Sequence, residues 1–180
     1  RQRQMCIRDR NISHYLSPLG KILLAADEEG ITGLWFENQK YYAYRLDQEH
    51  REQETPILIQ AKQWLSVYFS GREPDFMPPL HPVGTDFQMT VWNILREIPY
   101  GKTMTYGEIA RKVAERRGLS HMSAQAVGGA VSHNPISVLI PCHRVVGSNG
   151  NLTGYAGGIE KKKRLLSLEN VSLEHFFVPG

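Results

Sequence analysis

The stretch QAVGGAVSHNPISVLIPCHRVV, residues 125–146, contains the most unusual helix of this chain and its most reactive side chain. Residues 125–130 have almost no side-chain volume, and two adjacent glycines cost roughly 1 kcal/mol each in a helix relative to alanine. Close packing against another helix explains such a segment. Entry of its bare face into a narrow space, such as a DNA groove, explains it equally well.

The second part of this stretch is an apolar run, residues 137–140, which predicts a buried strand ending at Pro141-Cys142-His143-Arg144. A single cysteine is most often an inert buried hydrophobe. Here the neighbours supply a base, His143, and a permanent cation, Arg144, and both favour the nucleophilic thiolate. Because adjacent side chains of an extended segment point to opposite faces, we expect His143 to reach the thiol through a water or a turn.

Helix signals precede and follow this stretch. Thr105 and Glu108 form a capping box, which starts a helix, and a later helix begins at Ser123. Two helices separated by a short turn favour a helix-turn-helix in a DNA-binding and catalytic domain over residues 85–175. The predicted helices cover residues 86–98, 105–117, 123–133 and 160–169.

Residues 11–80 predict a smaller α/β domain. Two apolar runs, residues 21–26 and 31–36, flank an Asp-Glu-Glu-Gly turn and indicate a hairpin. Thr55 and Pro56 then start a helix that ends near Gly71. Four prolines between residues 74 and 82 mark the boundary between the two domains.

Residues 1–10, RQRQMCIRDR, differ from the rest, and we expect them to be foreign to the natural sequence or to form a basic disordered tail. The whole chain has a net charge of +3, but without the four Arg and one Asp of this segment it holds 17 basic and 17 acidic residues. Residues 11–80 hold 6 basic and 10 acidic residues, whereas residues 81–180 hold 11 and 7. The basic half suits a polyanionic partner.

Composition excludes several classes of protein. With 41% hydrophobic and 22% charged residues the chain is typical of a globular protein, and it has no apolar run long enough to span a bilayer. Two cysteines do not make a disulfide framework, so we expect a cytoplasmic protein with no membrane contact. We also expect no metal site, because a zinc site needs several Cys or His ligands, and outside Cys6 the N-terminal half offers only His14, His50 and His81.

The motifs of the C-terminal half closely resemble those of the O6-alkylguanine-DNA alkyltransferases, also called methylated-DNA-protein-cysteine methyltransferases. The resemblance covers most of residues 85–170 and implies an α/β fold. Its N-terminal domain would be ribonuclease-H-like, and its C-terminal alkyltransferase domain a helix-turn-helix of winged-helix-like type. The matching motifs are AVGG at 126–129, Asn134-Pro135, IPCHRVV at 140–146, GYAGG at 154–158, and Leu165-Leu166 with Glu169.

The resemblance implies direct-reversal DNA repair. A monomer without a cofactor would bind double-stranded DNA in the minor groove, extrude an O6-alkylguanine and transfer the alkyl group irreversibly to Cys142. O4-alkylthymine is left open as a second substrate. His143 would deprotonate the thiol through a water, and Glu169 would orient the imidazole. Tyr106 would donate to the leaving guanine, and Asn134 would brace the turn beside the DNA-binding helix.

The resemblance also implies the residues that contact substrate. Val145, Tyr155 and Ala156 would line the base pocket, and Arg144 would support the fold of the site. The family commonly has an arginine that fills the gap left by the extruded base, and here that position is Gln125. Glutamine lacks the planar cation, so this role stays open. The residues implied in DNA binding are Ser123, Gln125, Ala126, Gly128 and Gly129.

Two other functions share parts of these features. A non-catalytic protein that binds alkylated DNA could have the same fold, but relatives of that kind replace the nucleophilic cysteine, and Cys142 is present. A thiol hydrolase could use Cys142 and His143, but it would need a second, remote base and an oxyanion hole.

Overall fold

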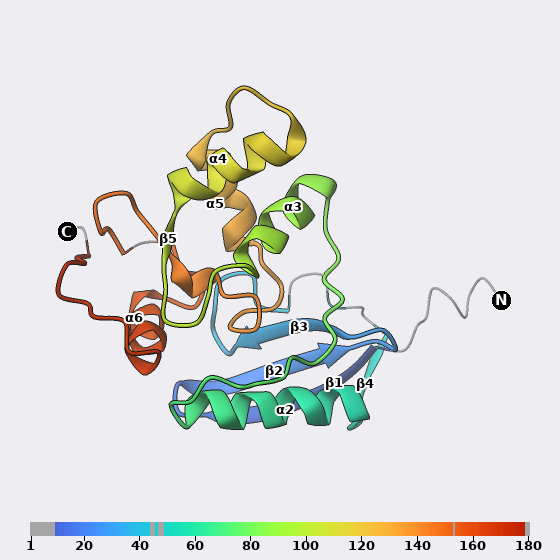
Figure 1. Ribbon diagram of the computed structural model, residues 1–180. Helices are drawn as coiled ribbons and strands as arrows, with labels where there is room; N and C mark the ends of the chain where they lie inside the picture. The colour runs from blue at the N-terminus through green and yellow to red at the C-terminus, as the bar shows by residue number, and fades with distance from the viewer. Residues whose placement is uncertain (1–9, 44–45, 47–48, 153, 179–180) are drawn as a thin grey trace. The chain divides into compact units, whose positions relative to one another are not determined.

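The computed structural model describes residues 10–43, 46, 49–152 and 154–178, and the chain divides into two compact units, residues 1–83 and 84–180 (Figure 1). The expected tail, residues 1–9, lies outside the described residues. No helix in the described ranges combines the length and apolar character that crossing a bilayer requires.

Among its described residues, the first unit is built on a four-stranded sheet and one helix. The strands are β1 (Arg10–Ser17), β2 (Gly20–Ala26), β3 (Ile31–Phe36) and β4 (His50–Glu52), in the order β3-β2-β1-β4. β1 pairs antiparallel with β2, and β2 with β3, whereas β4 pairs parallel with β1. The predicted hairpin is confirmed. Asp27 closes its turn by accepting hydrogen bonds from the backbone N–H groups of Glu29 and Gly30, at 2.9 and 3.1 Å.

The other two strands, β1 and β4, are absent from the sequence prediction. β1 begins at Arg10, inside the segment assigned to the tail, and its register pairs Arg10 with His50. All three residues of β4 are exposed, so hydrophobic periodicity carries no signal for this strand. Both strands exist because their backbones complete the sheet, and pairing of this kind is not visible in side-chain patterns.

The helix of this unit, α2 (Pro56–Phe69), lies along the sheet (Figure 1). It begins where the sequence predicts, because the hydroxyl of Thr55 accepts a hydrogen bond from the N–H of Leu58 at 3.3 Å. One face of α2 is buried and forms the core with the sheet. Its buried residues are Leu58, Ala61, Trp64, Leu65 and Tyr68.

The proline-rich connector is tied to β3. The N–H of Ile31 donates to the carbonyl of Pro79 at 2.8 Å, and the N–H of His81 donates to the carbonyl of Ile31 at 2.7 Å. The His81 ring also bonds to the buried carboxylate of Asp27, with 2.7 Å between Nδ1 and Oδ2. The connector therefore continues the fold of the first unit.

The second unit contains the four predicted helices together with two very short strands. Three of the helices, α3, α4 and α5, pack against one another, and the indole N–H of Trp92 in α3 donates to the carbonyl of Ala130 in α5 at 2.9 Å. The elements are α3 (Asp86–Leu95), β5 (Met104–Thr105), α4 (Tyr106–Arg117), α5 (Ala124–Ser132), the 3-10 helix η1 (Cys142–Arg144), β6 (Val145–Val146) and α6 (Ile159–Leu168).

The predicted capping box fixes the start of α4. The N–H of Glu108 donates to the hydroxyl of Thr105 at 3.1 Å, and the N–H of Thr105 donates to the Glu108 carboxylate at 2.8 Å. Just before this cap, β5 pairs parallel with β6, so that Met104 is opposite Val145. This pairing holds the first residue of α4, Tyr106, next to the segment that follows η1.

Residues 137–140 do not form the predicted strand; they form a buried turn. Val138 has a positive φ of 71°, and the N–H of Ile140 donates to the carbonyl of Ile136 at 3.0 Å. Pro135 and Pro141 stand near the two ends of the run and have no N–H for a strand ladder. A short apolar run can be buried in a turn as well as in a strand, so hydrophobicity alone does not distinguish these two structures. Cys142 therefore begins a 3-10 helix instead of ending a strand.

Candidate active site

The free thiol of Cys142 lies at the first position of η1 and is buried, with 5% of the residue exposed. Its backbone N–H donates to the carbonyl of Ile140 at 2.8 Å, which holds the backbone at this position. Burial raises the pKa of the Cys142 thiol, while the Asn134 amide, the charge of Lys162 and the Ser137 hydroxyl act in the opposite direction. Burial thus disfavours the thiolate, while these neighbouring groups favour it.

The base next to this thiol is part of a buried pair. Nε2 of His143 lies 2.7 Å from Oε2 of Glu169, the residue that ends α6, and neither side chain is exposed. Burial lowers the pKa of His143, although Glu169 opposes this effect. Burial acts to raise the pKa of Glu169, but its bonds to His143 and Arg144 lower the value to about 2. At neutral pH the pair is a neutral imidazole that donates from Nε2 to a carboxylate, which assigns the basic lone pair to Nδ1.

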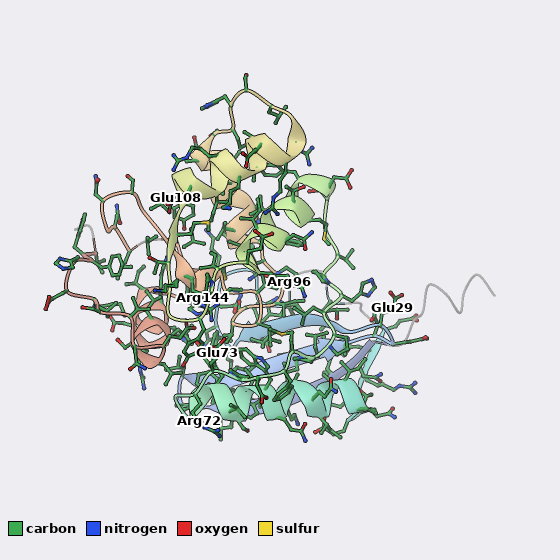
Figure 2. All side chains as sticks on the ribbon, viewed as in Figure 1. Glu29, Arg72, Glu73, Arg96, Glu108 and Arg144 are labelled. Atoms are coloured by element: carbon green, nitrogen blue, oxygen red, sulfur yellow. The ribbon has the colours of Figure 1, made fainter. Side chains whose placement is uncertain are left out.

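Arg144, which is labelled in Figure 2, binds the same carboxylate. Its Nε and Nη2 donate to the two oxygens of Glu169 at 2.9 and 3.0 Å, and Nη1 donates to the carbonyl of Ile98 at 2.7 Å. The N–H of Gly101 donates to Glu169 as well, at 2.9 Å. The guanidinium charge is therefore directed at Glu169, not at the thiol as the sequence prediction has it. Glu169 joins η1, α6 and the turn after α3 in one buried network.

Asn134 braces the turn that leads to the thiol. Its side-chain N–H group donates to the carbonyl of Ile140 at 2.9 Å and to that of Ile136 at 3.4 Å, and its Oδ1 accepts from the N–H of Ile136 at 3.0 Å. All of these bonds are buried. One side chain thus satisfies the backbone groups that a strand ladder would otherwise satisfy.

Two tyrosines border the thiol, and both are affected by the Cys142 charge. Burial, with a smaller effect of that charge, raises the pKa of Tyr106 to about 12 and that of Tyr155 well above its usual value. A Cβ on Gly154 would lie 2.7 Å from the Tyr106 hydroxyl, so this glycine makes room for it. Tyr155 is buried edge-on to the His143 ring, with ring centres 6.5 Å apart. The other two residues predicted to line the base pocket differ in their exposure, since Val145 is buried and Ala156 is half-buried.

The five residues predicted to bind DNA all lie at or in α5. The Ser123 hydroxyl caps this helix by accepting from the N–H groups of Gln125 and Ala126 at 3.1 and 3.3 Å. A Cβ on Gly129 would have no atom within 4 Å, and one on Gly128 would make only an ordinary contact of 3.9 Å with the Tyr106 ring. Gly129 therefore faces open space, and Gly128 leaves room for a methyl group beside Tyr106 of α4. Close packing against another helix, the alternative that the sequence leaves open, does not account for Gly129.

Comparison with known proteins assigns the family. Residues 12–82 match the ribonuclease-like domain of 6-O-methylguanine DNA methyltransferase, and residues 86–171 match the DNA binding domain of that family. A methylated-DNA-protein-cysteine methyltransferase of Methanosarcina acetivorans is 45% identical over 153 residues, which are 85% of this chain and 94% of the relative. The chain belongs to the 6-O-methylguanine DNA methyltransferase family.

Other relatives support the assignment. The Haemophilus influenzae methylated-DNA-protein-cysteine methyltransferase is 41% identical over 160 residues, with coverage of 88% of this chain and 86% of the relative. The crystal structure of Mycobacterium tuberculosis OGT in complex with DNA superimposes with a TM-score of 0.76 at 39% identity, and covers 88% of this chain and 92% of that one. The family resemblance is therefore confirmed. So is a two-domain fold with a ribonuclease-like and a DNA-binding domain.

In this member of the methyltransferase family, the sequence prediction lacks two residues near the thiol. Ser137 is hidden in the run assigned to a strand, and Lys162 stands in a basic run that suggests an exposed surface. Lys162 is fully buried, and its position relative to Leu165, Leu166 and Glu169 is the signal that could have found it. Among the described residues no group of three or more His, Cys, Asp or Glu side chains could hold a metal ion.

Proposed function

We propose that this chain is a methylated-DNA-protein-cysteine methyltransferase that transfers an alkyl group from O6-alkylguanine in DNA to the sulfur of Cys142. The observation that carries the proposal is a buried free thiol beside a buried His143–Glu169 pair in a chain of this family. A thiol of this kind is unreactive until it is deprotonated, and the pair supplies the base.

The proton leaves the thiol through a water to Nδ1 of His143. Nε2 of His143 is held by Glu169, whose pKa of about 2 keeps the carboxylate charged while the imidazolium forms. The arrangement is that of a base oriented by a buried acid, in which the acid stabilises the imidazolium without taking its proton.

The thiolate attacks the alkyl carbon, and the bond from this carbon to O6 of guanine breaks as the carbon–sulfur bond forms. The electron pair of the broken bond stays on guanine. The Tyr106 hydroxyl is protonated at neutral pH because its pKa is about 12, and it donates a hydrogen bond to the guanine ring. The product is a thioether, which has no easy leaving group for water or another thiol to expel. Each molecule therefore repairs one lesion, and no cofactor takes part.

DNA binds to α4 and α5, which act as a helix-turn-helix. The face of α5 that carries Gly128 and the open position Gly129 approaches the minor groove, with Ser123 and Ala126 at its start. Extrusion of the damaged base brings it to a pocket lined by Val145, Tyr155 and Ala156, while the exposed Gln125 occupies the vacated space in the duplex. Asn134 and Arg144 act indirectly, since they hold the turn and the Glu169 carboxylate.

The test is a titration of a fixed amount of protein with excess O6-methylguanine duplex, followed by mass measurement of the peptide that contains Cys142. We expect a gain of one methyl group per protein, on this peptide only, and no gain in Cys142→Ala, which should still bind the lesion. Product beyond one methyl per protein without added thiol would overturn the single-turnover mechanism. Binding without any gain of mass would instead select a non-catalytic lesion-binding protein, and turnover of an ester or amide would select a hydrolase.

A further inference from the structure

Helix α6 carries four consecutive cationic residues, of which one is fully buried. The exposed fraction of Lys162 is 0%, whereas its neighbour Lys163 is half-buried and lies 3.7 Å from the exposed Glu160 carboxylate. A lysine is almost never fully buried without a specific reason, because removing an ammonium group from water is costly. Burial therefore separates Lys162 from the other cationic residues of α6.

Lys162 lies on the same face of α6 as the carboxylate of the site. Lys162, Leu165 and Glu169 follow each other at spacings of three and four residues, and all three are buried. This face packs against η1, where Glu169 binds His143 and Arg144. Lys162 stands two turns earlier, about 10 Å along the helix axis at 1.5 Å per residue. This face thus carries a carboxylate at one end and a buried lysine at the other, and it packs against the segment that carries the thiol.

We propose that Lys162 is the counter-cation of the Cys142 thiolate, and that its ammonium group sets the fraction of reactive sulfur at neutral pH. The proposal rests on the alkyl transfer proposed above and adds to it a positioning residue that acts on the charge of the nucleophile. The thiol proton still leaves through His143, and Lys162 keeps its own proton throughout.

The other titratable groups around the thiol cannot supply this charge. Burial keeps His143 neutral, Tyr106 and Tyr155 stay protonated and uncharged, and Arg144 is bonded to Glu169. The charge of Lys162 acts on the thiol in the direction that favours the thiolate, and the charge of Cys142 acts back on the ammonium group. Burial lowers the pKa of Lys162 to about 8, so the group is still mostly protonated at pH 7.

The test uses the full chain without DNA and a small alkylating reagent, iodoacetamide. The rate of Cys142 modification, read from the mass of its peptide so that Cys6 does not interfere, is measured from pH 6 to pH 10.5. In Lys162→Met and Lys162→Gln we expect the rate at pH 7.5 to fall roughly tenfold. The rates should converge on that of wild type at pH 10.5, where Lys162 of wild type has also lost its proton. Lys163→Met, a neutral change on the same helix, should leave the profile unchanged.

An unchanged rate at pH 7.5 in both folded variants overturns the proposal, and so does a rate lowered equally at every pH, which indicates a purely structural role. The outcome is independent of the alkyl transfer itself. If wild type takes no methyl group from DNA but the variants still lose rate at pH 7.5 and recover it at pH 10.5, the proposed function is wrong and the role of Lys162 stands. If wild type takes the methyl group and the variants keep its rate at pH 7.5, only the role of Lys162 is wrong.

Discussion

At the scale of single residues, α6 contributes two buried groups of opposite charge to the site, Lys162 within the helix and Glu169 at its end. Glu169 accepts hydrogen bonds from His143, Arg144 and Gly101, so it positions the base and the turn after α3 together. Its buried charge is offset by these partners. Burial disfavours the charged form of Lys162, which lowers its pKa, whereas the partners of Glu169 favour its charged form.

Lys162 should make the fold less stable below pH 8. Its pKa falls from 10.5 in the unfolded chain to about 8 in the fold, so the unfolded state holds more protons between these values and stability rises with pH across this window. Lys162→Met removes the penalty and should raise the free energy of unfolding at pH 7 by up to about 3 kcal/mol. Urea unfolding at pH 7 and pH 10.5 checks this, because the gain should disappear at the higher pH. A loss of stability at pH 7 would contradict the prediction.

Gly154 should control the position of the Tyr106 hydroxyl. Its φ is 80°, and an added Cβ would lie 2.7 Å from that hydroxyl. Gly154→Ala should therefore slow single-turnover methyl transfer about tenfold, the effect of losing roughly 1.4 kcal/mol of transition-state stabilisation. Gly158→Ala is the matched control, since its φ is 98° but nothing lies within 4 Å of the new Cβ. Both variants lose stability through backbone strain, and only the first should lose rate.

At the scale of elements, α5 combines low helix propensity with an open face. Gly129→Ala adds a methyl group that meets no atom, so it should raise the free energy of unfolding by about 1 kcal/mol. The same methyl group should weaken binding to duplex DNA about tenfold, or 1.4 kcal/mol, if this face enters the groove. Fluorescence anisotropy at constant salt measures the second effect. Gln63→Ala on the exposed side of α2 controls for helix stabilisation alone, and unchanged affinity in Gly129→Ala would place the groove contact elsewhere.

The elements also show what a sequence reveals and what it hides. Helices with a capping residue, such as the one that begins after Thr105, are predicted to within a few residues, because the cap and the apolar face are both local signals. The turn at residues 137–140 is missed because its residues are apolar but do not pair as a strand. Strand β4 is missed because it pairs in the sheet but has no apolar residue. Of the site, the Cys142 motif is visible in the sequence, but the buried cation is not. The buried lysine is one of three consecutive lysines, and their sequence does not show which of them is buried.

At the scale of the whole molecule, the charge of the first residues should matter little to function. Three arginines and one aspartate lie in residues 1–9, and the surplus of basic residues in 81–180 does not depend on them. A variant that begins at Arg10, the first residue of β1, should keep its methyl transfer and nearly all of its DNA affinity. The slope of log K against log salt should change by less than about 1. Loss of most of the affinity would show instead that this segment is part of the DNA-binding surface.

The bond from Trp92 to the Ala130 carbonyl gives the protein a built-in optical reporter. Of the three tryptophans in the chain, Trp35 and Trp64 lie in the first unit and only Trp92 in the second. Its indole N–H is bonded to α5, the helix with the open glycine face, and it is buried away from solvent. With Trp35 and Trp64 changed to phenylalanine, the emission of Trp92 would follow any displacement of α5 in real time. Docking on DNA and the chemical step could then be separated by stopped-flow fluorescence without an added dye.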